Sequence, residues 1–234
     1  MNTNHVDQKI EEINSIKLFD LAQVSRPEIT ALNNVIILNS SNLQLEERTV
    51  KGSNLNSNGA FIAIWKGLSL PNNIEEFVGR VDLTSTSSGG EWAPKEITVE
   101  PGINLKTGFF TIGLFLQKDD LLSLGAQVNL MQGTAQNVQP SSIFVVNPTN
   151  TNIPVNYSVP NLVNPQVCRY LLKLYEGEGP FFGKTPIAFK YIDSGDNVGI
   201  TNFPVKLSAG TYTVQLNPGV SGSPYSATYT FKLS

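Results

Sequence analysis

Phe61-Ile62-Ala63-Ile64-Trp65-Lys66-Gly67 has a counterpart in residues 170–177, which read Tyr-Leu-Leu-Lys-Leu-Tyr-Glu-Gly. Two further pairs of segments match in the same order along the chain, 35–39 with 143–147 and 107–112 with 209–214. The partners lie roughly 102–110 residues apart, and such drift is what insertions in surface loops produce. The sequence therefore predicts one β-rich unit that occurs twice.

Each predicted unit has the size and strand spacing of a β-sandwich. The chain has 234 residues, so each copy holds about 100, enough for seven to nine strands. Turn residues such as Asn58-Gly59 and Pro101-Gly102 separate short apolar runs, which is typical of sandwiches and not of βαβ units. The strands expected are 35–38, 61–66, 78–83, 96–99, 109–116, 127–131, 143–146, 155–159, 170–175, 188–192, 203–207, 211–216 and 227–233.

The duplication divides the chain into three parts. We expect an N-terminal arm at 1–34, a first sandwich at 35–138 and a duplicate sandwich at 141–234, with Gln139-Pro140-Ser141 as a short linker. The fold class is thus all-β: two tandem, internally duplicated antiparallel β-sandwich domains preceded by a short amphipathic helix. A short linker restricts the mutual orientation of the two units.

The arm carries an apolar stripe at helical spacing. Val6, Ile10 and Ile13, with Ile16 beside them, predict a helix of about three turns, which is marginal on its own in water. Its stripe must therefore pack on one of the two sandwiches or on another protomer, and the sequence leaves both open. Arg26-Pro27 ends the pattern, because the residue before a proline avoids the α region.

The composition is poor in charge. Charged residues make up 15% of the chain, against about 25% in ordinary soluble proteins. An uncharged polar surface suits packing against copies of the same chain or contact with neutral ligands such as sugars; compositional bias of the source genome is the alternative. The net charge is −3 and Lys and Arg do not cluster, which argues against nucleic acid as a partner.

Most catalytic and metal chemistry lacks its residues. The one histidine, His5, lies in the arm, and Cys168 is the one cysteine, so His-dependent triads, nearly every zinc site and an intrachain disulfide are excluded. We expect Cys168 to be a buried thiol. Adjacent strand residues point to opposite faces, so carboxylate doublets such as Glu46-Glu47 are read as exposed charges and not as catalytic pairs. We predict no enzyme activity and no cofactor.

The loop Asp193–Asn197 supplies about three oxygen-bearing side chains, whereas Ca²⁺ takes six to eight ligands. We therefore read the loop as a turn, with calcium as the alternative.

Aromatic residues give the remaining candidates for a site. Trp65 and Tyr175 occupy matched positions, which predicts that both pack in a core. Trp92 lies in a Gly-rich loop, and Phe181-Phe182 cannot both face the core from an extended chain. We expect Trp92, Phe181 and Phe182 to be ligand contacts if the protein binds carbohydrate; otherwise Trp92 folds back over its own domain.

The N-terminus lacks the basic and apolar regions of a signal peptide, and no run approaches the ~18 apolar residues of a membrane span. We expect a product that is cytoplasmic by default, or that is released and assembled by a non-classical route.

Leu207-Ser208-Ala209-Gly210-Thr211-Tyr212-Thr213-Val214 resembles the penultimate strand of bacterial immunoglobulin-like and fibronectin-type-III-like modules, in which a Tyr packs near the sandwich corner. In the first copy Phe110 stands in place of Tyr212, so a corner hydrogen bond from a hydroxyl is absent there. The resemblance implies a fold and carries no function. No Cys…Trp…Cys spacing of antibody domains occurs.

Two functional hypotheses follow. The first is a structural protein that associates with itself through the arm (Val6, Ile10, Ile13, Ile16) and through open sandwich edges. The alternative is a carbohydrate-binding or adhesion module that uses the loop aromatic residues.

Overall fold

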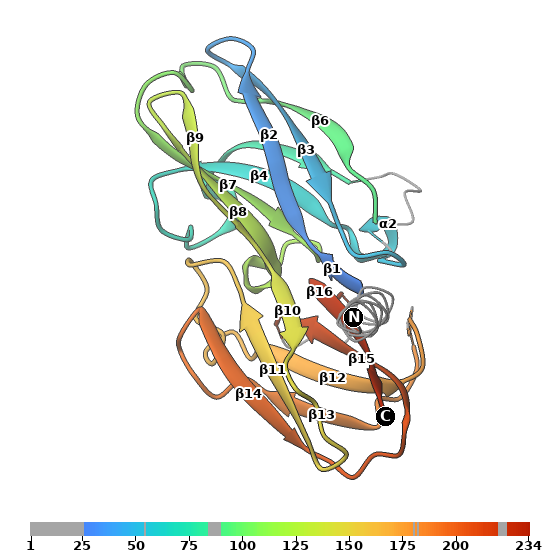
Figure 1. The fold of residues 1–234 in the computed structure, drawn as a ribbon. Helices are drawn as coiled ribbons and strands as arrows, with labels where there is room; N and C mark the ends of the chain where they lie inside the picture. Colours follow the sequence, from blue (N-terminus) through green and yellow to red (C-terminus); the bar gives the residue numbers. More distant parts are fainter. Residues whose placement is uncertain (1–25, 54, 84–89, 180, 182, 220–223) are drawn as a thin grey trace, which may run out of the picture.

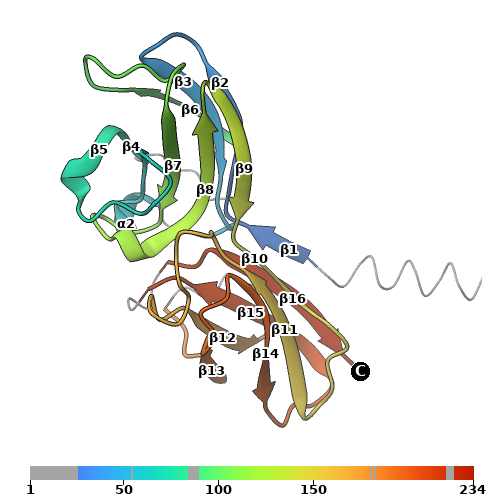
Figure 2. The ribbon, with the colours of Figure 1, turned by 90° about the vertical axis from the view of Figure 1, so that its left-hand side faces the viewer.

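The computed structural model describes residues 26–53, 55–83, 90–179, 181, 183–219 and 224–234. In this part of the chain, two antiparallel β-sandwiches lie end to end (Figures 1 and 2). This confirms the all-β class and the sandwich architecture. No helix among the described residues is long and apolar enough to cross a membrane.

The first sandwich packs the three-stranded sheet β2-β3-β6 on the five-stranded sheet β5-β4-β7-β8-β9. Ile62, Ile64, Ile112 and Leu114 are fully buried in its core. The strands are β2 (Ala31–Ile37), β3 (Asn42–Arg48), β4 (Phe61–Lys66), β5 (Phe77–Asp82), β6 (Ala93–Thr98), β7 (Phe109–Phe115), β8 (Leu124–Met131) and β9 (Thr134–Pro140), with short helices α2 (Leu55–Asn58), η1 (Ile74–Glu76) and η2 (Leu121–Ser123) in the loops.

The second sandwich packs β10-β11-β14 on β1-β16-β15-β12-β13. Its core includes Val155, Leu172, Leu174 and Val214, all fully buried. The strands are β1 (Arg26–Ile29), β10 (Ser142–Val145), β11 (Asn152–Ser158), β12 (Leu171–Glu176), β13 (Ala188–Tyr191), β14 (Val198–Pro204), β15 (Gly210–Asn217) and β16 (Ala227–Leu233).

The two sandwiches exchange their edge strands. Each strand of the first has a counterpart of the same order and direction in the second, and β9, which pairs with β8, corresponds to β1, which pairs with β16. β1 precedes β2 in the chain just as β9 precedes β10. The first strand of each repeat therefore completes the sandwich of the other repeat.

The contacts at the crossing repeat in the same way. Thr30 follows β1 and Ser141 follows β9, and these two buried residues form an antiparallel bridge. The Glu28 carboxylate of β1 accepts a hydrogen bond of 2.7 Å from the backbone N–H of Lys51. The Gln139 amide oxygen of β9 accepts one of 2.7 Å from the backbone N–H of Asn161. The crossing thus has an approximate twofold symmetry.

The observed strands differ from three expectations. Residues 26–34 form β1 and the beginning of β2, where we had expected the helical arm; residues 1–25, with the expected helix, lie outside the described residues. Residues 139–141 are the end of β9 and the crossing, and are not a linker. The strand β3 at 42–48 was not expected. We propose two domains, 31–140 and 141–234, the second completed by 26–29.

An aromatic layer covers the outer face of the first five-stranded sheet. The rings of Phe61, Trp65, Phe77 and Phe115 lie 4.8–6.1 Å apart between centroids. The Trp65 indole N–H donates to the carbonyl oxygen of Ser69 at 2.6 Å. Trp65 and its matched residue, Tyr175, are 1% and 5% exposed, which confirms that both are core residues.

Glu47 is 1% exposed, contrary to the exposed charge that its place in a doublet predicted. Its inward position follows from strand alternation, since the neighbouring Glu46 points outward. Among the described residues, its Oε1 atom has no hydrogen-bond partner. Burial raises the pKa of the Glu47 carboxyl, and the charge of Lys95 opposes the rise only in part.

We expect Glu47→Gln to stabilise the protein more at pH 7 than at pH 4. With its pKa raised in the folded state, Glu47 destabilises the fold increasingly as the pH rises from the unfolded pKa through the folded one. The substitution removes that ionisation. Urea unfolding of both proteins at the two pH values measures the effect, and a stability difference that is constant with pH would contradict it.

Candidate interaction surface

The outer side of the sheet β10-β11-β14, here called the apolar face, exposes large hydrophobic side chains. Residues that alternate with the buried core point outward on these strands. Phe144, Asn156 and Ile200 form one row across the three strands. Phe144 is 49% exposed, Ile200 65% and Val198 68%. The face consists of Ser142, Phe144, Pro154, Asn156, Ser158, Val198, Ile200 and Asn202, none of them charged.

The matching face of the first sandwich, on β2-β3-β6, carries charge. Glu46 accepts a hydrogen bond of 2.6 Å from the Asn34 amide, and Glu96 pairs with Gln44 in the neighbouring strand. This face also exposes a large apolar residue, Ile36, at 56%. Each repeat therefore has this three-stranded sheet, but its outer face is uncharged only in the second sandwich.

The edge formed by β13 and β14, next to the apolar face, also lacks the charged pairs that the corresponding edge of the first sandwich carries among the described residues. Phe189 on β13 is 64% exposed, and its ring contacts Tyr191 edge-on at 6.4 Å. The corresponding edge of the first sandwich has Arg80 paired with Asp82 at 2.7 Å and with Asp119 at 2.8 Å. Charges and prolines on an edge strand discourage pairing with other chains. The edge of the second sandwich lacks such ion pairs among its described residues.

The expected contact residues do not gather on this surface. Trp92 is 39% exposed in the first sandwich, and its role as a ligand contact stays a prediction. Phe181 is 5% exposed and stacks on Tyr175 with centroids 4.7 Å apart, so its ring packs inward. Phe182 and the arm residues Val6, Ile10, Ile13 and Ile16 lie outside the described residues.

The residues of the apolar face escaped sequence reasoning because their strands were read as core. The run 143–146 is apolar throughout, yet Ile143 and Val145 are buried while Phe144 is half exposed. Strict alternation of the strand was the available signal.

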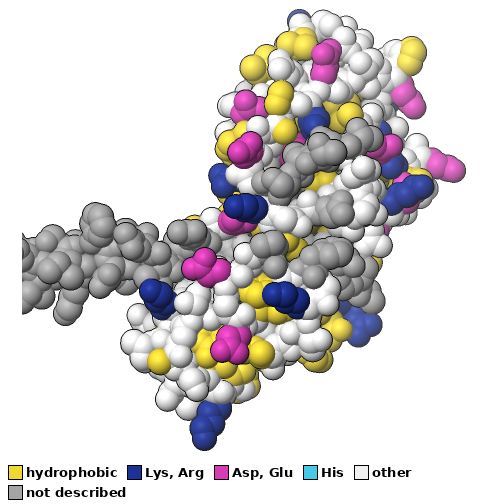
Figure 3. All heavy atoms as spheres, turned by 90° about the vertical axis from the view of Figure 1, so that its right-hand side faces the viewer, with side chains coloured by type: hydrophobic (Ala, Val, Ile, Leu, Met, Phe, Trp, Pro, Cys, Tyr) yellow, Lys and Arg dark blue, Asp and Glu magenta, His cyan; other side chains and the backbone are white. Residues whose placement is uncertain are grey.

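The surface outside the apolar face agrees with the low proportion of charged residues in the chain. Figure 3 shows one side of the molecule, on which uncharged groups predominate and charged side chains are scattered. Cys168 is a buried free thiol, as expected, and burial raises its pKa.

Comparisons with known proteins give structural likeness only. No protein-family model matches the chain, and no curated protein matches it. The human OSCAR ligand-binding domain is 15% identical, with 88% of this chain and 95% of that chain covered and a TM-score of 0.24. A DUF3823 family protein from Bacteroides ovatus is 11% identical, with 88% and 99% covered and a TM-score of 0.31. The chicken CNTN1 FN1–FN3 domains are 12% identical, with 88% and 68% covered and a TM-score of 0.28.

These neighbours are immunoglobulin-like or fibronectin-type-III-like β-sandwich proteins. At such TM-scores, the fold assignment of this chain rests on its own strand pairing. One detail agrees with the expected resemblance: the Tyr212 hydroxyl donates to the carbonyl oxygen of Ser208 at 2.9 Å, as a tyrosine at the sandwich corner does.

Proposed function

We propose that this protein is a non-enzymatic structural module that associates with copies of itself through the apolar face. The observation that carries the proposal is the exposure of Phe144, Val198 and Ile200 on a face without charge. Exposed apolar residues that gather on one face commonly mark a protein contact. The charged matching face of the first sandwich shows that the sheet itself does not require this composition.

A second copy of the chain is the partner that the chemistry favours. In a twofold interface the same face meets itself, so any uncompensated charge on it meets a like charge. A face built from Phe, Val, Ile, Pro, Ser and Asn avoids that repulsion. β14 lies at the edge of its sheet in the described structure, so its outward backbone groups can also pair with the edge of a second copy. Association through the arm remains a separate prediction.

The test compares two matched substitutions. Ile200→Glu places a charge on the apolar face, and Ile36→Glu places one at an exposed position of the matching face. We expect the wild type and Ile36→Glu to gain mass with concentration in light scattering, and Ile200→Glu to stay monomeric. A wild type that remains monomeric up to millimolar concentration, or equal behaviour of the two variants, would refute the proposal.

A further inference from the structure

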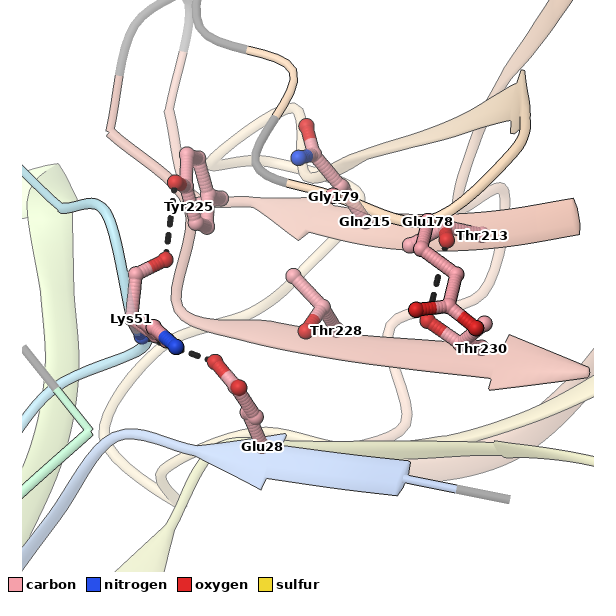
Figure 4. A pocket seen from close by; sticks show the side chains of 9 residues that line it. All are labelled: Glu28, Lys51, Glu178, Gly179, Thr213, Gln215, Tyr225, Thr228 and Thr230. Carbon is pink, nitrogen blue, oxygen red and sulfur yellow. Dashed lines mark hydrogen bonds between the residues drawn. The ribbon is translucent and has the colours of Figure 1, made fainter. Parts of the chain in front are cut away.

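A polar pocket of about 200 Å³ lies on the outer face of the five-stranded sheet of the second sandwich (Figure 4). It faces away from the apolar face, since the two sheets are opposite layers of one sandwich. Strands β1, β15 and β16 form its floor, and the loops at Lys51, Glu178 and Tyr225 form its walls.

The floor of the pocket is buried although it belongs to an outer face. Thr213 is 1% exposed, Gln215 is 3% exposed and Thr228 is 8% exposed. The same face of the first sandwich is filled by aromatic rings: Gly113 is the counterpart of Gln215, and a Cβ atom there would lie 2.9 Å from the Trp65 ring. One repeat thus closes this space with apolar packing, while the other keeps it hollow and polar.

Gln215 lies on the floor of the pocket. It is 3% exposed, and Figure 4 shows its side chain among those that line the pocket. An amide that is shielded from bulk water at the floor of a pocket gains from a ligand that can hydrogen-bond to it. The amide oxygen and the amide N–H groups together can bind a hydroxyl as donor and as acceptor.

Other residues of the pocket are already held in place by hydrogen bonds of their own. Thr213 and Thr230 share a hydrogen bond of 2.9 Å. The Tyr225 hydroxyl donates to the carbonyl oxygen of Lys51 at 3.2 Å. Burial raises the pKa of Tyr225 to about 12, so its phenol stays neutral at physiological pH. A site held by such contacts needs little rearrangement on binding.

The charges at the pocket restrict the ligand. Two carboxylates, of Glu28 and Glu178, line it together with one cationic residue, Lys51, whose backbone N–H donates to Glu28, so negative charge predominates. Carboxylates accept hydrogen bonds from hydroxyl groups and repel anions. We propose that this pocket binds one ring of a neutral sugar, with Gln215, Glu28 and Glu178 as its hydrogen-bonding residues and Tyr225 as its apolar wall.

The experiment titrates the full-length protein with glucose, galactose, mannose, N-acetylglucosamine and glucuronate, observed by saturation-transfer NMR of each sugar. Gln215→Leu removes the amide at nearly constant volume, and Gln136→Leu makes the same change at an exposed position of β9. We expect at least one neutral sugar to bind the wild type and Gln136→Leu, binding weaker by tenfold or more in Gln215→Leu, and no signal from glucuronate.

Glu178→Gln is the second variant, because Glu178 is exposed in a loop and its substitution spares the core. We expect this change to weaken the same sugar several-fold. The proposal is overturned if no neutral sugar binds, or if Gln215→Leu and Glu178→Gln bind as the wild type does. These results do not depend on self-association, which Ile200→Glu tests separately.

Discussion

A chain that begins at Ala31 should unfold its second sandwich well below the temperature of the full-length protein. It lacks β1, whose residues pair with Thr230 to Ala227 of β16, and it loses the contact between Glu28 and Lys51. At about 1 kcal/mol for each net hydrogen bond, the loss is of the order of 3 kcal/mol. Calorimetry should show a Tm lower by about 10 °C or more.

The control is a chain that begins at Ser25 and keeps β1. It should melt as the full-length protein does, so any change in its self-association reports on residues 1–24 alone. Faster hydrogen exchange in β16 but not in β8 would place the damage in the second sandwich. Equal melting of the chains that begin at Ser25 and at Ala31 would contradict the importance of the exchanged strand.

Trp65→Ala should cost about 3–5 kcal/mol, the range for large aromatic residues deleted from a core. Trp65 contacts the rings of Phe77 and Phe115, and its indole N–H is bonded to Ser69. The variant leaves a cavity over Gly113, whose missing side chain cannot fill it. Urea unfolding measures the loss as a shift of the midpoint.

Trp92→Ala is the matched control, since Trp92 is 39% exposed. Surface substitutions usually change stability by about 0.5 kcal/mol or less. Similar losses in the two variants would show that the aromatic layer over β4 and β7 contributes less to stability than its burial indicates.

Sequence repetition predicted the paired strands well where the apolar pattern is strong. The backbone N–H of Gly67 donates to the carbonyl oxygen of Phe109 in β7 at 2.8 Å. At the matched position, the N–H of Gly177 donates to the carbonyl oxygen of Thr211 in β15 at 2.7 Å. The match of 35–39 with 143–147 was wrong by a few residues, and β2 also contains a bulge between Asn33 and Ile36. According to the strand pairing, Leu32 of β2 and Ile143 of β10 are the equivalent positions in the two repeats.

The strand exchange could not be predicted from the same pattern. β1 has a proline in second place, Pro27, and β9 ends at Pro140, which reads as loop. An edge strand tolerates proline because one side of its backbone needs no partner. Which sandwich an edge strand joins depends on contacts between distant residues, such as Thr30 with Ser141, that no local spacing reveals.

The candidate surfaces depend on exposure, which composition does not report. Ile200 and Phe203 lie on one strand, one 65% and the other 1% exposed. Gln215 points away from the sandwich core on β15, yet it is 3% exposed. Comparison of the two repeats is informative here, because a residue that differs between matched positions marks a property that only one sandwich has.

The pairing of β1 with β16 also decides how the molecule bears mechanical load. Arg26 lies opposite Thr230, and the strands are antiparallel, so the chain enters and leaves this ladder at the same end. A force that pulls residues 26 and 234 apart would open the hydrogen bonds one after another, as a zipper opens, instead of shearing them together. Attachments at residues 26 and 234 would lie side by side, and this pairing would open at low force.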